Sequence, residues 1–213
     1  FEPLAVKFNE HLIELGFPKC SGAVMASNPF WRKSVSGYKT AIAQWVESLD
    51  EKSLLALSIF LDASCVAGDE KLMDVCKQYT NEHFEGRSDT LAHLAKSALA
   101  FETPLTLFSR FVLGRSFHEG ELDIKKGGIF AIVHGVRVLA LEHKILDTNT
   151  TQRIKELNNA GLFDKQFASE LIEAYDTLLW IRLRSMLLQQ NNQTQNFVNP
   201  KLFSKTDRDL LKD

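Results

Sequence analysis

The sequence predicts a mainly α-helical protein, and two features carry this prediction. Apolar residues recur every three or four positions over most of the 213 residues, which is the period of an amphipathic helix. Polar or glycine-containing stretches separate these periodic segments, and several of the stretches end in an asparagine or aspartate that is suited to capping a helix.

The first two helices are expected within the N-terminal 50 residues. Apolar residues at helical spacing predict a helix over 5–15, which Gly16, Phe17 and Pro18 terminate. The segment 19–28 is short and contains a glycine, so an extended segment or a turn is expected there. Asn28 followed by Pro29 predicts an N-cap and a first helical residue, so the second helix should run from this pair through the next apolar residues.

Aspartates mark the next two elements. Asp50 precedes the apolar run 51–66, which is long and rich in Leu and Ala; a helix is favoured, and a buried strand is the alternative. Gly68 interrupts this run, and Asp69 should cap a further helix over 70–84.

The second half of the chain is expected to form a bundle. An irregular or extended segment is predicted over 103–123, and helices are predicted over 89–103, 126–143, 149–160 and 164–190. Amphipathic helices of this length need mutual burial to be stable. These helices should therefore pack as an antiparallel bundle.

Two of the bundle helices carry charged residues within their apolar faces. His134 and Arg137 lie in one stripe of the helix that follows Lys125 and Lys126, and Arg182 is in register with the apolar face of the last helix. Two inward arginines need partners, because an unpaired buried guanidinium costs several kcal/mol at order of magnitude. We therefore expect Arg137 and Arg182 to approach each other or to share a carboxylate.

Three explanations of these arginines remain open. Each arginine could pair with a carboxylate, and four acidic residues are available: Asp62, Asp123, Glu142 and Asp176. The side chains could instead extend from a helix edge to water. In the functional interpretation they bind an anion, together with the lysine pair near a helix N-terminus.

Composition excludes several classes of protein. The net charge of −2 offers no general attraction for nucleic acid or for an acidic membrane, and no apolar run approaches the roughly 18 residues of a membrane span. Cys20, Cys65 and Cys76 form no CxxC pair, which favours free thiols in a reducing cytoplasm and gives no zinc site. The six histidines form no H-x-x-x-H pair, so no metal site is expected.

The C-terminus contains an Asp-x-Asp pair, Asp207 and Asp209. Such pairs hold magnesium in phosphoryl-transfer enzymes. Ser204 and Asp207 also fit the S-x-x-D pattern of a helix start, and this capping role is favoured.

Several motifs together resemble a known family. GFPKCSGAVMASNPFW at 16–31 and SIFLDASCVAGDEKL at 58–72 resemble the end of a nucleotidyltransferase domain that is related to the uridylyltransferase of the signalling protein PII. LDIKKGGIFAIVHGVRVLALEHKI at 122–145, TNTTQRIKEL at 148–157 and EAYDTLLWIRLR at 173–184 resemble the helical substrate-binding domain that follows it. The resemblance covers nearly the whole chain.

This resemblance implies a fold and an organisation in domains. Residues 1–86 would be the C-terminal, helical flank of the nucleotidyltransferase domain. Residues 87–213 would be a substrate-binding bundle similar to the C-terminal domain of aminoglycoside nucleotidyltransferases. The chain contains no Gly-Ser turn followed by an Asp-x-Asp pair, so the catalytic half is expected upstream of Phe1 and no catalytic residue is expected here.

The resemblance also implies a function. The chain would belong to a bacterial cytoplasmic signalling protein with upstream CBS or cyclic-nucleotide-binding domains, and a homodimer is one expected assembly. The substrate would be a nucleotide or an acidic protein, and the full-length enzyme would need magnesium. Basic residues near the family's motif positions would bind this substrate: Lys125, Lys126, Arg137, Arg153, Arg182 and Arg184. The alternative is a non-catalytic helical sensor or docking module.

Overall fold

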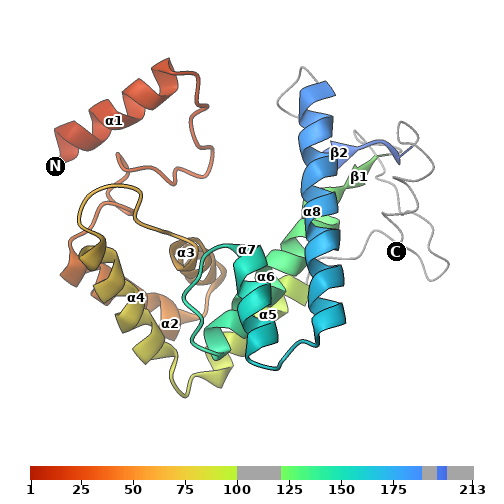
Figure 1. Cartoon of the computed structure of the whole chain (residues 1–213). Helices are drawn as coiled ribbons and strands as arrows, with labels where there is room; N and C mark the ends of the chain where they lie inside the picture. The colour runs from red at the N-terminus through yellow and green to blue at the C-terminus, as the bar shows by residue number, and fades with distance from the viewer. Residues whose placement is uncertain (100–120, 189–195, 201–213) are drawn as a thin grey trace.

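The computed structural model describes residues 1–99, 121–188 and 196–200, and within these ranges the protein is mainly α-helical (Figure 1). This confirms the fold class that the sequence predicts. The helices are α1 (Glu2–Glu14), α2 (Val35–Ser48), α3 (Glu51–Leu61), α4 (Glu70–Phe84), α5 (Ser88–Leu99), the π-helix η1 (Lys125–Ile129), α6 (Phe130–Glu142), α7 (Thr150–Asn159) and α8 (Lys165–Leu188). Strands β1 (Leu122–Asp123) and β2 (Phe197–Val198) pair antiparallel.

Aspartate and asparagine side chains start several of these helices. Asp50 accepts a hydrogen bond from the Ser53 amide at 2.9 Å, and Asp69 accepts one from the Lys71 amide at 3.1 Å. Both contacts satisfy a backbone donor of the first helical turn. The run after Asp50 is therefore a helix, α3, and the strand alternative is wrong.

The predicted start of α2 at Asn28 is also wrong. The Asn28 side chain stabilises a turn instead, since it accepts from the Phe30 amide at 3.0 Å and donates to the Ala23 carbonyl at 2.9 Å. The N-cap of α2 is Ser34, whose hydroxyl accepts from the Gly37 amide at 3.0 Å. An asparagine before a proline suits a turn as well as a helix start, and the side-chain partners decided between the two.

Three apolar clusters hold the helices together. The first lies among α2, α3 and α4, with Trp45, Leu57 and Phe60 at its centre, and it also includes Leu94 of α5 and Leu141 of α6. The second joins β1, β2 and α8, and the third joins α6, α7 and the first half of α8. Because the first cluster continues into α5 and α6, the apolar packing crosses residue 87. The division into 1–86 and 87–213 stays a prediction.

The glycine pair before α6 permits a close approach between helices. η1 packs against α8, and a Cβ atom placed on Gly128 would lie 2.8 Å from Cδ1 of Leu178. Real Cβ contacts are essentially never that short, so a larger residue here would require the Leu178 side chain or the two helices to shift. Gly128 therefore has a packing role.

Helix α1 has little contact with the rest of the protein. It contains no buried residue, and in Figure 1 it stands apart from the other helices. Two polar contacts connect it to the segment before α2: the Ser27 amide donates to Asn9 Oδ1 at 2.8 Å, and Arg32 pairs with Glu2 at 3.3 Å. Among the described residues, no helix combines the length and apolar character needed to cross a membrane.

Candidate functional site

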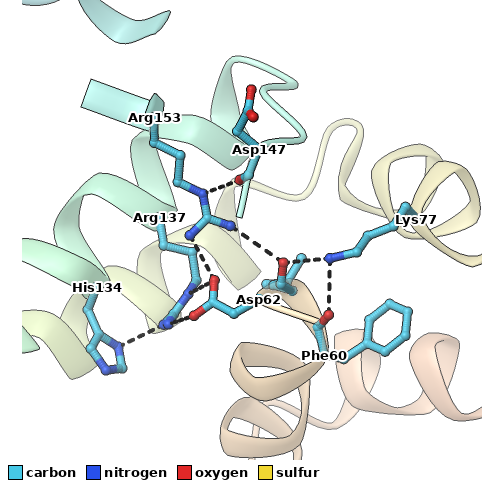
Figure 2. Close-up of polar contacts among 8 residues, drawn as sticks. Phe60, Asp62, Lys77, His134, Arg137, Asp147 and Arg153 are labelled. Carbon is cyan, nitrogen blue, oxygen red and sulfur yellow. Dashed lines mark hydrogen bonds and ion pairs between the residues drawn. The ribbon is translucent and has the colours of Figure 1, made fainter. Parts of the chain in front are cut away.

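The carboxylate of Asp62 binds two arginines from different helices (Figure 2). Asp62 is the C-cap residue of α3. Arg137 of α6 donates through Nε to Oδ1 at 3.1 Å and through Nη2 to Oδ2, while Arg153 of α7 donates through Nη1 to Oδ1 at 2.7 Å. One carboxylate thus connects α3 to α6 and α7.

Both arginines are buried, and each of their guanidinium nitrogens has an acceptor. The side chains of Arg137 and Arg153 are 7% and 3% exposed, against 32% for Asp62. Arg153 also donates to the backbone carbonyl of Asp147 and, at 3.4 Å, to that of Leu61. A buried guanidinium is tolerated only with such partners. These contacts explain why α6 carries an arginine on an inward face.

The electrostatics of the junction follow from burial and from the paired charges. Burial alone would raise the pKa of Asp62, but the hydrogen bonds and charges of Arg137 and Arg153 outweigh it and lower this pKa below its usual value. His134 contacts Arg137 Nη1 through Nδ1 at 3.2 Å. Burial and the positive charge of Arg137 lower the pKa of His134, and Asp62 opposes this shift. His134 therefore favours its neutral form, in which Nδ1 can accept from the guanidinium.

Lys77 of α4 reaches the same junction from the other side. Its Nζ donates to the carbonyls of Phe60 at 3.1 Å and Leu61 at 2.6 Å, so it caps the C-terminus of α3. Burial, followed by the charge of Arg153, lowers the pKa of Lys77 to about 8; Asp62 opposes the shift and Arg137 adds to it. Three cationic side chains thus surround one carboxylate.

A cleft of about 530 Å³ opens beside Lys77. One face of α4 forms a wall, and the loops that follow α3 and α6 form the rest. Most of the residues that line it are of polar types: the lining consists of Ala63, Ser64, Cys65, Glu70, Met73, Asp74, Lys77, Gln78, Asn81, Leu146, Asp147 and Thr148. Asp147 and Lys77 belong both to the lining and to the junction around Asp62, so the cleft and the ionic junction are adjacent.

The structure brings together only two of the predicted basic residues, Arg137 and Arg153. The expected pairing of Arg137 with Arg182 is wrong, because Arg153 is the residue that shares a carboxylate with Arg137. Arg182 instead donates through Nε to Asn196 Oδ1 at 3.0 Å. Helix periodicity placed both arginines inward, but it carried no information on which helices would be neighbours.

The other basic candidates lie in the region of η1 and α8. The Lys125 ammonium stands 4.9 Å from the Phe130 ring centre, and exposed Lys126 has its amide bonded to Asp123 Oδ1 at 3.0 Å. Arg184 is half-buried on α8. η1 packs on α8, and α8 packs on β2. These residues form the η1–α8 group, which we define as Lys125, Lys126, Arg182 and Arg184.

The remaining candidates concern metals. Asp207 and Asp209 lie outside the described residues, so neither the capping role nor the metal role of this pair can be followed in the structure. Within 1–99, 121–188 and 196–200, no group of three histidine, cysteine or carboxylate side chains is arranged to hold a metal ion.

The sequence alone missed Lys77 as part of the site. Its position on the α4 stripe of polar residues gives no reason to distinguish it from the other lysines. Asp62 was one of four carboxylates considered as arginine partners. Its place at the end of an apolar helix was the available signal, since a charge there lies at the edge of a core.

Comparison with known families agrees with the motifs. Residues 88–213 match the family described as "Putative nucleotidyltransferase substrate binding domain", which is more than half of the chain. The chain belongs to this family. Residues 1–52 match a second family, described as "Putative nucleotidyltransferase". No curated protein and no solved structure matches the chain.

The junction at Asp62 connects the substrate binding domain to the segment that precedes it. Arg137 and Arg153 belong to the nucleotidyltransferase substrate binding domain, whereas Asp62 and Lys77 lie in the segment 53–87 between the two matches. The two arginines therefore tie the substrate binding domain to the helices that precede it.

Proposed function

We propose that this chain supplies the substrate-binding helices of a nucleotidyltransferase related to the PII uridylyltransferase. The order of the two family matches, with a nucleotidyltransferase region first and its substrate binding domain second, carries this proposal. The motifs GFPKCSGAVMASNPFW and SIFLDASCVAGDEKL support the relationship to the PII enzyme. The whole protein would work in the bacterial cytoplasm as a signal-transduction enzyme, as a homodimer, with CBS or cyclic-nucleotide-binding domains upstream.

In this proposal the six basic residues have two different tasks. Arg137 and Arg153 hold Asp62 and orient α6 and α7, because their donors are already engaged. The η1–α8 group contacts the anionic substrate, since Lys126 is exposed and Arg182 and Arg184 are only half-buried. Basic side chains that reach water bind phosphate or carboxylate without the cost of breaking a buried ion pair.

Magnesium would act in the whole enzyme. When bound, it would neutralise charge on the nucleotide phosphates. Gly-Ser and Asp-x-Asp residues upstream of Phe1 would hold it. The described helices would then position the substrate, and such positioning accounts for a large part of phosphoryl-transfer catalysis.

The test is a charge reversal in the full-length protein. We expect Lys126→Glu and Arg182→Glu each to raise KM at least about tenfold with kcat nearly unchanged, because uniform substrate binding is lost. The assay follows transfer of a labelled nucleotidyl group to PII-like acceptors. Lys155→Glu is the control, since Lys155 is an exposed residue of α7. Equal KM values in all three variants would contradict the substrate role of the η1–α8 group.

A docking module is the second candidate, and the exposed apolar residues of α1 and of the turn that follows it favour this function. Leu4, Phe8, Leu15 and Phe17 are each more than half exposed, and surfaces of this kind often contact another protein. Full-length protein that fails to transfer any nucleotide, yet loses binding of its partner on Phe8→Ser, would support this alternative over the enzyme.

A further inference from the structure

We propose that Lys77 is a site of reversible carbamylation, in which carbon dioxide adds to its side-chain nitrogen. This inference concerns a chemical modification and does not depend on the proposed nucleotidyltransferase function. Three features of the structure carry it: the cleft at Lys77, the surplus of positive charge around Asp62, and the hydrogen bonding of the two carbonyls that Lys77 contacts.

The cleft provides access and space. Lys77 lines a cavity of about 530 Å³, bounded by α4 and by the loops at 63–65 and 146–148. Carbon dioxide adds only three heavy atoms to an amine, and the product needs room for one planar carboxylate beyond Nζ. Lys77 thus reaches the cleft, and its Nζ lies 5.4 Å from the centre of the Phe60 ring.

The charge of the junction favours an anion at this position. Arg137, Arg153 and a protonated Lys77 contribute three positive charges, and Asp62 contributes one negative charge. A carbamate on Lys77 would replace one positive charge with a negative one, so the four groups would become neutral together. The Nη2 atom of Arg153 and Nζ of Lys77 donate to the same Leu61 carbonyl, at 3.4 and 2.6 Å. A carbamate oxygen on Lys77 would thus form close to a guanidinium.

The carbonyls at the end of α3 tolerate the change. A carbamate nitrogen keeps one N–H, so at least one of the two carbonyl contacts of Lys77 is lost. The Phe60 carbonyl also accepts from the Ala63 amide at 3.0 Å, and the Leu61 carbonyl also accepts from Arg153. Neither acceptor would be left without a donor, which removes the main penalty of modifying a capping lysine.

The chemistry needs only carbon dioxide and a neutral amine. The lone pair of Nζ forms a bond to the carbon of carbon dioxide while one C–O π bond becomes a lone pair on oxygen, and the nitrogen releases a proton to water. No oxidant or reductant takes part. Because burial lowers the pKa of Lys77 to about 8, the neutral amine is populated near neutral pH.

Charged and titratable groups lie near Lys77 on α3, α4, α6 and α7 and in two of the loops between them. They are Asp62 at the end of α3, Cys65 in the next loop, Glu70 and Asp74 on α4, His134 and Arg137 on α6, Asp147 in the loop before α7, and Arg153 on α7. The side chains of Glu70, Asp74 and Asp147 are exposed to water, which screens their repulsion toward a carbamate. The two arginines are buried and are screened far less.

The experiment traps the carbamate on the 213-residue chain. The protein is equilibrated with ¹³C-labelled carbon dioxide at pH 7 and pH 8, at equal dissolved carbon dioxide, and is then alkylated with a trialkyloxonium salt and mapped by mass spectrometry. We expect labelled adduct at Lys77 and at least about fivefold more of it at pH 8, because the neutral fraction of an amine with a pKa near 8 rises from about one tenth to about one half. Exposed Lys71 is the internal comparison.

Lys77→Arg is the matched variant, because it keeps a positive charge and donors for the two carbonyls. Its ¹³C spectrum should lack the carbamate signal that wild-type protein shows. The proposal is overturned if Lys77 carries no adduct at pH 8 while a small peptide amine in the same tube is trapped. Equal labelling of Lys71 and Lys77 would overturn it as well. Both outcomes are read from wild-type protein, so the test does not depend on the folding of the variant.

Discussion

Asp62 and Arg137 are 75 positions apart in the sequence, and two hydrogen bonds join their side chains. This pair, extended by Arg153, connects the end of α3 to the two central helices of the substrate binding domain. The carboxylate is half-buried, while the guanidinium is almost inaccessible to water. Removal of the carboxylate therefore leaves a charge that the protein interior cannot solvate.

Asp62→Asn should destabilise the protein by about 2–4 kcal/mol at pH 7, because two buried arginines lose their counter-charge. Urea unfolding followed by circular dichroism measures this loss. Since the pKa of Asp62 is lowered in the folded state, its contribution is complete above the ordinary pKa of an aspartate, about 4, and disappears as pH falls through the lower folded value. The gap between wild type and variant should therefore shrink only in acid.

Asp74→Asn is the control for this substitution, since Asp74 is an exposed residue of the neighbouring helix α4. Its effect should stay within about 0.5 kcal/mol. A loss of less than about 1 kcal/mol for Asp62→Asn would mean that water already solvates the two arginines.

Stability should also depend on His134 between about pH 7.5 and 5. The folded pKa of His134 is lowered, so the unfolded chain takes up a proton first as pH falls through about 6.5. This uptake favours unfolding, and the loss should level off below the folded pKa. In His134→Gln the side-chain oxygen can still accept from Arg137 but does not titrate. As pH falls over this range, the urea midpoint of the variant should therefore decrease less than that of the wild type. Equal decreases in the two proteins would show that His134 does not resist protonation.

Gly128→Ala should destabilise the protein by about 1–3 kcal/mol, because its Cβ would lie 2.8 Å from Leu178 Cδ1. Gly135 provides a matched control: it lies in α6, and an added Cβ there meets nothing within 4 Å. Gly135→Ala should stabilise by up to about 1 kcal/mol through helix propensity. Chemical denaturation distinguishes the two.

The double variant Gly128→Ala/Leu178→Val should recover part of the loss of stability. A lack of recovery would assign the defect to the backbone.

The 213-residue chain alone should transfer no nucleotidyl group in the presence of magnesium and a nucleoside triphosphate. Its sequence lacks a Gly-Ser turn followed by an Asp-x-Asp pair, and positioning together with metal-based charge stabilisation accounts for most of the catalysis in this chemistry. Labelled nucleotides and PII-like acceptors provide the assay. Metal-dependent labelling that disappears on Asp207→Asn or Asp209→Asn would show that the C-terminal pair is catalytic.

Local signals predicted most of the helices. Asp50 and Asp69 cap α3 and α4 as expected from their place before apolar runs, and the predicted helix at 149–160 is α7 with Asn149 as its cap. Each of these signals involves residues within a few positions of each other. The prediction that α2 starts at Asn28 was wrong for the same reason. The competing cap at Ser34 is just as local and is equally compatible with the sequence.

The sequence by itself predicted that Arg137 would be inward and would need a counter-charge, because periodicity and the cost of burying a guanidinium are properties of one helix at a time. It predicted the same of Arg182, which is half-buried and donates to Asn196 instead. Only the tertiary structure decided that Asp62 is the partner, that Arg153 rather than Arg182 joins Arg137, and that Lys77 approaches from α4. These choices depend on which helices become neighbours. The packing of large apolar surfaces sets that arrangement across 75 and 91 positions of the chain, and no local pattern encodes it.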